Sequence, residues 1–157
     1  MANIDRQMAD RVWKRVQNMP EEPGRDMNLK KLIMDEKMAA GAYLQLARQL
    51  GTEEASRLRQ MAREEKSHAA CMTGMYILTH GNRPEVKMPR QQRQSAQQLL
   101  QRAYAGELGS IAAYETLSDH PEYGQVFRSM AQQEREHSRA VLEMLGRLEE
   151  KTGGSRK

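Results

Sequence analysis

The sequence has a single cysteine, one tryptophan and one phenylalanine among its 157 residues. One cysteine, Cys71, excludes an internal disulfide and any iron or zinc site built from Cys-x-x-Cys pairs. No apolar run approaches the ~20 residues that a membrane-spanning helix needs, and no secretory hydrophobic segment follows Met1. We therefore expect a soluble cytoplasmic protein that does not associate with membranes.

The residues that are abundant favour helices. Glutamate, methionine, alanine, leucine, glutamine and arginine dominate, and all of them are good helix formers. The composition therefore predicts an all-α protein, and the length predicts one domain. The net charge is +4, but lysines and arginines are interspersed with glutamates and glutamines, as on an ordinary solvated surface. Binding to nucleic acid is therefore not expected.

The chain divides into three parts. In residues 1–27 an apolar residue recurs at every fourth position from Ile4 to Val16, which predicts a short amphipathic helix followed by a linker rich in proline. Residues 28–150 carry four longer helical patterns, which we expect to end at Gly51, at Gly81, before Asp119 and near 150. The segment 151–157 is predicted to be a disordered tail.

The connection between the second and third helices is unusually long. It covers residues 81–94 and contains two prolines. Fourteen extended residues reach at most ~46–50 Å, which is just enough to travel the length of the bundle. The connection therefore predicts a crossover, as in a ferritin-like four-helix bundle.

One pattern of charged and aromatic residues occurs twice, about 70 residues apart. Each copy has a glutamate with a tyrosine seven positions later, and then a Glu-x-x-His motif about 28 residues after the first glutamate. The positions are Glu36, Tyr43, Glu65 and His68 in the first copy, and Glu107, Tyr114, Glu134 and His137 in the second. Residues three apart lie on one helix face, so each motif presents a carboxylate and an imidazole together.

These glutamates and histidines fall at positions where the helical pattern calls for apolar residues. Burying unpaired carboxylates would cost several kcal/mol each, but two divalent cations would neutralise four of them. Mixed oxygen and nitrogen donors suit iron or manganese. The alternative is an ordinary helical bundle in which the same side chains are exposed and paired with arginines.

The repeated pattern over residues 28–148 resembles that of ferritin-like di-iron proteins of the rubrerythrin and bacterioferritin type. The resemblance implies that Glu65 and Glu134 bridge two metals. It also implies that Glu36 and Glu107 are terminal ligands and that His68 and His137 complete one metal each. Tyr43 and Tyr114 match tyrosines that lie beside the metals in that family. Glu64 matches an acid that orients the opposite histidine, whereas its counterpart in the second copy is Gln133, so the two metal sites need not be equivalent.

Three departures from these relatives stand out. Rubrerythrins carry a further glutamate where this chain has Ser110, which puts their redox-linked ligand switching in doubt. The four cysteines of a rubredoxin module are absent, so electrons would come from an external donor. Bacterioferritins bind haem through a methionine where this chain has Lys66, so no haem is expected.

The function expected from the resemblance is a di-iron oxidoreductase, a peroxidase or ferroxidase that reduces hydrogen peroxide or dioxygen. Tyr43 and Tyr114 are the candidate catalytic residues, and the cofactor would be two iron ions, with manganese possible. We expect a homo-oligomer, a dimer or larger. Three alternatives remain: an iron storage or detoxification module in a larger assembly, a manganese catalase-like enzyme, and a di-metal oxygenase, which would need a sizeable apolar pocket beside the metals.

Overall fold

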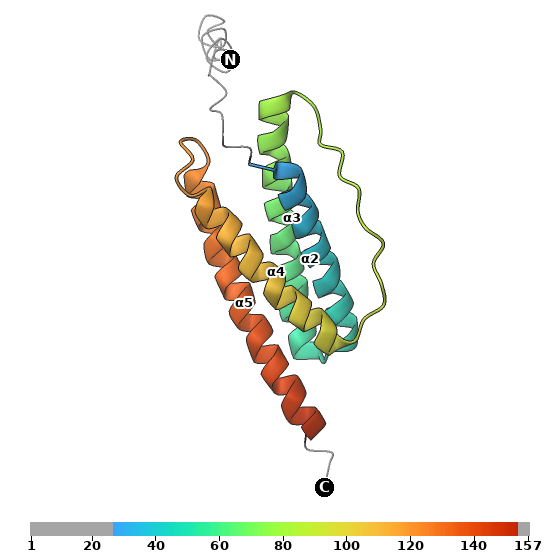
Figure 1. Ribbon diagram of the computed structural model, residues 1–157. Coiled ribbons are helices and arrows are strands. Elements are labelled where there is room, and N and C mark those ends of the chain that lie inside the picture. The colour runs from blue at the N-terminus through green and yellow to red at the C-terminus, as the bar shows by residue number, and fades with distance from the viewer. Residues whose placement is uncertain (1–26, 154–157) are drawn as a thin grey trace, which may run out of the picture.

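The computed structural model describes residues 27–153 as four α-helices (Figure 1). They are α2 (Leu29–Gln49), α3 (Thr52–His80), α4 (Ala96–Thr116) and α5 (Gly124–Gly153). The described residues contain no strand, so the predicted all-α four-helix bundle is confirmed. The predicted N-terminal helix and the last four residues lie outside the described part of the chain.

The helices form two hairpins, α2 with α3 and α4 with α5, and the hairpins meet along α2 and α4. The segment 81–95 between α3 and α4 runs along the outside of the bundle, from one end to the other (Figure 1). The long crossover between the second and third helices is therefore present as predicted. It places α4 antiparallel to α2, so that the middles of all four helices lie at one level.

Both ends of the crossover carry local signals that the sequence displays. Gly81 ends α3 with φ +77°, a left-handed conformation that glycine adopts without steric cost. Ser95 begins α4 with a capping box. Its hydroxyl accepts the backbone N–H of Gln98 at 3.2 Å, and the Gln98 side chain accepts the backbone N–H of Ser95 at 3.1 Å.

The last helix differs from the prediction at both ends. Proline favours the first turn of a helix, which would place the start of the helix at Pro121, but α5 begins at Gly124, because residues 121–123 form a separate turn. The ring nitrogen Nδ1 of His120 accepts the backbone N–H groups of Glu122 and Tyr123 and stabilises this turn. A Cβ at Gly124 would lie 2.5 Å from the Ser118 carbonyl oxygen, so only glycine fits there. At the other end α5 continues to Gly153, three residues beyond the predicted limit at 150.

Two clusters of buried apolar side chains fill the bundle, one on each side of its middle. The first lies near the α2–α3 turn and includes Leu46, Leu58, Leu100 and Val141. The second lies toward the α4–α5 connection and includes Ile33, Met72, Phe127 and Met130. Burial of each such side chain contributes about 1.5–3 kcal/mol. These two clusters stabilise a bundle whose middle layer is polar.

Among residues 27–153, no helix combines the length and the apolar character that crossing a membrane requires.

Candidate metal centre

All six predicted ligands lie in the middle layer and are buried, with exposed fractions between 0 and 4%. The helices α2 and α4 provide one glutamate each, and α3 and α5 provide a glutamate and a histidine one turn apart. The residues are Glu36, Glu65, His68, Glu107, Glu134 and His137. The alternative of exposed, arginine-paired side chains is wrong, because water scarcely reaches any of the six.

The six residues form two overlapping groups, each able to hold a metal ion. One group contains Glu36 and His68, the other contains Glu107 and His137, and both contain Glu65 and Glu134. Within each group the potential ligand atoms all lie within 4.8 Å of one another. The arrangement therefore offers two metal sites that share two carboxylates.

In the group that contains Glu36 and His68, several buried polar atoms lack a hydrogen-bond partner. Four of its buried atoms have no hydrogen-bond partner: Glu36 Oε2, Glu65 Oε2, His68 Nδ1 and Glu134 Oε1. His68 Nδ1 lies only 2.8 Å from Glu134 Oε1, close enough for an ion pair but without the geometry of a hydrogen bond. Unsatisfied buried polar atoms cost about 1–3 kcal/mol each. A cation at their centre would satisfy all four, so these residues fit a metal ion.

Each histidine is held by a partner on the opposite hairpin. His137 Nε2 lies 2.7 Å from Glu64 Oε2, and His68 Nε2 lies 2.7 Å from Gln133 Oε1. Both partner oxygens can only accept, so each Nε2 carries a proton and donates it. The other nitrogen, Nδ1, consequently faces the glutamates in both rings. The contact expected between Glu64 and the opposite histidine is present. In the second copy of the motif, Gln133 occupies the position that corresponds to Glu64 and contacts His68.

Two fully buried tyrosines connect the hairpins on the other side of the centre. The Tyr43 hydroxyl on α2 donates to Glu107 on α4, and the Tyr114 hydroxyl on α4 donates to Glu36 on α2. Burial, and then the nearby carboxylates, raise the pKa of both phenols well above the ordinary value. Tyr43 and Tyr114 therefore stay protonated and hold one oxygen of Glu107 and of Glu36, respectively.

Comparison with known families gave one match. The rubrerythrin family model matches residues 98–157 of the chain. The C-terminal half carries a rubrerythrin domain. This ferritin-like di-iron match covers Glu107, Glu134 and His137, whereas the equivalence of the first hairpin rests on the repeated motif and on the geometry above. Searches among curated proteins and among solved structures found no match.

In the metal-free state, two of the four carboxyl groups between the four helices are protonated. Burial raises the pKa of Glu36 to about 9, with a further contribution from Glu65. Burial likewise raises the pKa of Glu107 to about 11, helped by its contact with Glu134. Glu36 and Glu107 are therefore neutral at pH 7 when no metal is bound.

The other two carboxyls and the histidines are ionised. Burial opposes ionisation of Glu65 and Glu134, but the nearby histidines, together with Glu36 beside Glu65, outweigh it and lower both pKa values. Burial also opposes charging of the rings, but contacts with Glu134 and other carboxylates raise the pKa of His137 to about 11 and that of His68 further. Two imidazoliums thus balance two carboxylates. Two divalent metals would displace one proton from each imidazolium and one each from Glu36 and Glu107.

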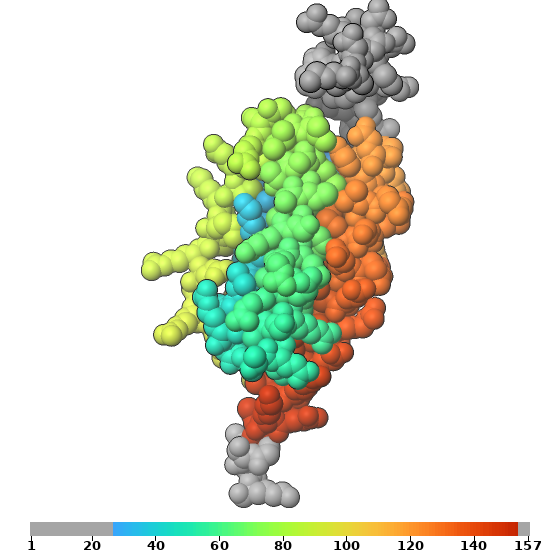
Figure 2. All heavy atoms as spheres, turned by 180° about the vertical axis from the view of Figure 1, so that it is seen from behind, coloured from blue at the N-terminus to red at the C-terminus, as the bar shows by residue number. Residues whose placement is uncertain are grey.

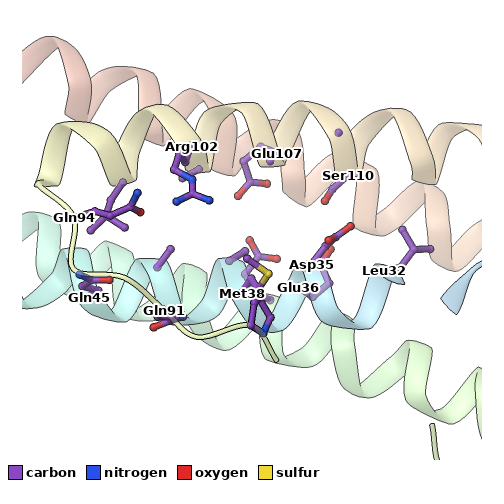
Figure 3. Close-up of a pocket in the computed structure, with 18 of the residues that line it drawn as sticks. Leu32, Asp35, Glu36, Met38, Gln45, Gln91, Gln94, Arg102, Glu107 and Ser110 are labelled. Atoms are coloured by element: carbon purple, nitrogen blue, oxygen red, sulfur yellow. The ribbon is translucent and has the colours of Figure 1, made fainter. Parts of the chain in front are cut away.

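The structure also shows features that the sequence did not indicate. Cys71 is exposed, because Ala69 and Met72 take the core positions of that turn. A cavity of about 630 Å³ lies between α2, α4 and the crossover and reaches the centre (Figure 3). Its one sequence signal is a row of small residues on α4, at Gly106, Gly109, Ser110 and Ala113.

Proposed function

We propose that this protein is a di-iron oxidoreductase that reduces hydrogen peroxide or dioxygen. The observation that carries the proposal is the pair of buried four-residue groups that share Glu65 and Glu134. Two divalent ions neutralise the four carboxylates that the centre contains. The rubrerythrin match over residues 98–157 supports iron as the metal.

In this proposal each residue has a definite part. Glu65 and Glu134 would be shared by the two ions, Glu36 and His68 would help to hold one, and Glu107 and His137 would help to hold the other. When bound, the iron pair supplies electrons and Lewis acidity for the cleavage of an O–O bond. The protein's own contribution is to hold the ligands rigidly and to exclude water, and both core clusters serve this purpose.

The tyrosines position the terminal ligands. Tyr43 holds a proton at its phenol oxygen and engages Oε1 of Glu107, which leaves the second oxygen of that carboxylate for a metal. Tyr114 does the same for Glu36. These contacts support a positioning role for both tyrosines. That either tyrosine takes part directly in catalysis stays a prediction.

The test combines metal analysis with a rapid reaction. The purified full-length chain should contain two metal ions, and the ferrous form should consume one hydrogen peroxide per two irons in a stopped-flow experiment. Continued turnover with an added reductant would identify a peroxidase, and a single round of oxidation a ferroxidase. A chain that binds no metal pair would contradict the proposal. Evolution of oxygen by a manganese form would replace it with peroxide disproportionation.

A second candidate is oxidation of an organic molecule beside the metals. We predicted that such an oxygenase would need a sizeable apolar pocket there. The cavity of about 630 Å³ between α2 and α4 has the size, and its wall combines apolar residues such as Leu32, Ala39 and Leu99 with charged ones. A product formed from an organic compound would distinguish this candidate from simple peroxide reduction.

A further inference from the structure

The cavity between α2 and α4 exists because both helices present small side chains to it. Gly106, Gly109 and Ser110 on α4 face Ala39 and Ala42 on α2, and the crossover closes the outer side. Figure 3 shows the crossover running along α2 to the start of α4, with Gln91 and Gln94 labelled on it. The result is a cavity between α2 and α4 that is open to the surface, where Gly106 and Gly109 are exposed.

This cavity reaches the metal centre from one side. Glu36, Glu65 and Glu107 belong to its wall, and Figure 3 shows Glu36 and Glu107 approaching each other across it from α2 and α4. The opposite face of the bundle is covered by α3 and α5, which lie side by side in Figure 2. On that side Glu64 and Gln133 hold the two histidines. A molecule in the cavity would therefore lie directly beside the terminal and bridging carboxylates.

The size of the cavity exceeds what the oxidant needs. A water molecule takes about 30 Å³ in the liquid, and hydrogen peroxide is only slightly larger. Sites for small organic ligands typically measure about 300–1,000 Å³. The cavity, at about 630 Å³, has the size of an organic-ligand site.

The charge of the cavity wall selects the sign of the ligand. Apart from the carboxylates of the metal centre, the wall contains three cations, Lys31, Arg90 and Arg102, and one further acid, Asp35. Lys31 is paired with Asp35. Neither arginine has an ion-pair partner among the described residues, and the Arg102 side chain projects into the space between α4 and α2 (Figure 3). When a metal pair neutralises the carboxylates of the centre, the remaining wall charges are mainly positive and favour an anion.

We propose that the cavity binds a small organic anion with an apolar body. This proposal rests on the proposed function, because it assumes that the six ligands hold a metal pair. The acid group of the anion pairs with Arg102, whose planar guanidinium can donate two parallel hydrogen bonds to a carboxylate. The apolar body lies against Ala39, Ala42 and Ala113, toward Glu36 and Glu107. This assigns a ligand class to the space beside the centre.

The first experiment measures binding without turnover. Octanoate is titrated into the full-length chain loaded with Co²⁺, and calorimetry is combined with the visible spectrum of the metal. We expect saturable binding of one octanoate per chain, a spectral change, and at least tenfold weaker binding of the neutral octanamide. Octanoate that binds no better than octanamide, or not at all, would overturn the proposal.

Two substitutions with matched controls locate the site. Arg102→Gln should weaken octanoate binding about tenfold or more without affecting octanamide, whereas Arg93→Gln, an exposed residue of the crossover outside the cavity wall, should change neither. Ser110→Leu should fill the space and abolish binding, whereas Ser129→Leu, on the exposed face of α5, should not. Both leucines favour the helix, so loss of folding is not expected. Unchanged octanoate binding in Ser110→Leu would place the ligand elsewhere and contradict the proposal.

These measurements separate the two proposals. A chain that binds two metals and reduces peroxide but ignores octanoate would overturn only the ligand assignment. A chain that binds no metal pair would overturn the proposed function, whatever octanoate does. Dissociation of an assembly in Ser110→Leu, seen by sedimentation, would show instead that a second copy of the chain covers the cavity and would overturn the ligand assignment.

Discussion

The two halves of the metal centre are built alike but differ in the residue that holds each histidine. In the half that contains His137, Nε2 donates to the carboxylate of Glu64. In the half that contains His68, the same nitrogen donates to the amide oxygen of Gln133. A carboxylate partner makes an imidazole a more basic, stronger ligand than an amide partner does. We therefore expect the two metal sites to differ in strength.

The charge state of Glu64 supports this distinction. Burial opposes its ionisation, but the hydrogen bond from His137 outweighs burial and lowers the pKa of Glu64. Glu64 is therefore an anion at pH 7, whereas Gln133 is neutral at any pH. In addition, all four unsatisfied buried atoms belong to the His68 half. The His137 half is better satisfied without a metal, and the His68 half depends more on one.

Removing a shared ligand should have the largest effect. Glu65→Ala takes a carboxylate from both groups, so we expect the metal content to fall from two ions per chain to nearly none. Glu36→Ala takes a ligand only from the His68 group and should leave about one ion. Elemental analysis after gel filtration measures both, with the exposed Glu136→Ala as a control that keeps two. Equal metal content in Glu65→Ala and Glu36→Ala would mean that Glu65 is not shared.

Exchanging the residues that hold the histidines should have the next largest effect. In Glu64→Gln both histidines contact an amide oxygen, so the affinity for the more tightly bound metal should fall about 10–100-fold. In Gln133→Glu both histidines contact a carboxylate, so the affinity for the more weakly bound metal should rise by a similar factor. Competition with a chromophoric chelator measures both affinities. Two ions of equal affinity in the unaltered chain would contradict the comparison on which this prediction depends.

The candidate ligands could be predicted from the sequence because two independent spacings agree. Glu-x-x-His fixes two side chains on one helix face, and the apolar residues before and after Glu65 and Glu134 fix the direction of that face. The length of the segment 81–94 then determines the topology. These signals are local or repeated in the sequence, and the helices and buried faces of the bundle agree with them.

Other features depend on contacts that a sequence pattern does not contain. The start of α5 follows from the close approach of Gly124 to the Ser118 carbonyl, which overrides the signal at Pro121. The cavity follows from the space that small residues leave between α2 and α4, and that space depends on how the helices pack. The exposure of Cys71 likewise depends on which neighbouring residues enter the core.

The metal-free protein should lose stability as the pH rises. The folded-state pKa values of Glu36, Glu107 and His137 are raised to about 9, 11 and 11. A raised pKa gives stability that is complete below the unfolded value and disappears as the pH rises through the folded value. The melting temperature of the metal-free form should therefore fall from pH 6.5 to 9, and that of the metal-bound form should change less. A parallel fall in both forms would contradict the assignment.

Metal binding at pH 7 should release protons in a definite number. Glu36, Glu107, His68 and His137 each hold one proton in the metal-free centre that the metal-bound centre lacks, which makes about four protons per two ions. Titration in lightly buffered solution with a pH indicator, or calorimetry in buffers of different ionisation enthalpy, counts them. Release of none would mean that the ligands are already deprotonated before the metal binds.

The tyrosines should show the smallest difference between the halves, because their contacts are equivalent. Tyr43→Phe removes the donor to Glu107, and Tyr114→Phe removes the donor to Glu36. Each leaves a buried carboxyl oxygen without its partner, so each should lower the free energy of unfolding of the metal-free protein by about 1–3 kcal/mol. Urea denaturation measures this loss, and Tyr104→Phe, at a partly buried position beside the first core cluster, serves as the control and should cost less. Nearly equal losses would show that the asymmetry between the halves is confined to Glu64 and Gln133. A clearly larger loss in Tyr114→Phe would extend the asymmetry to the terminal ligands, with the less satisfied His68 half depending more on its tyrosine.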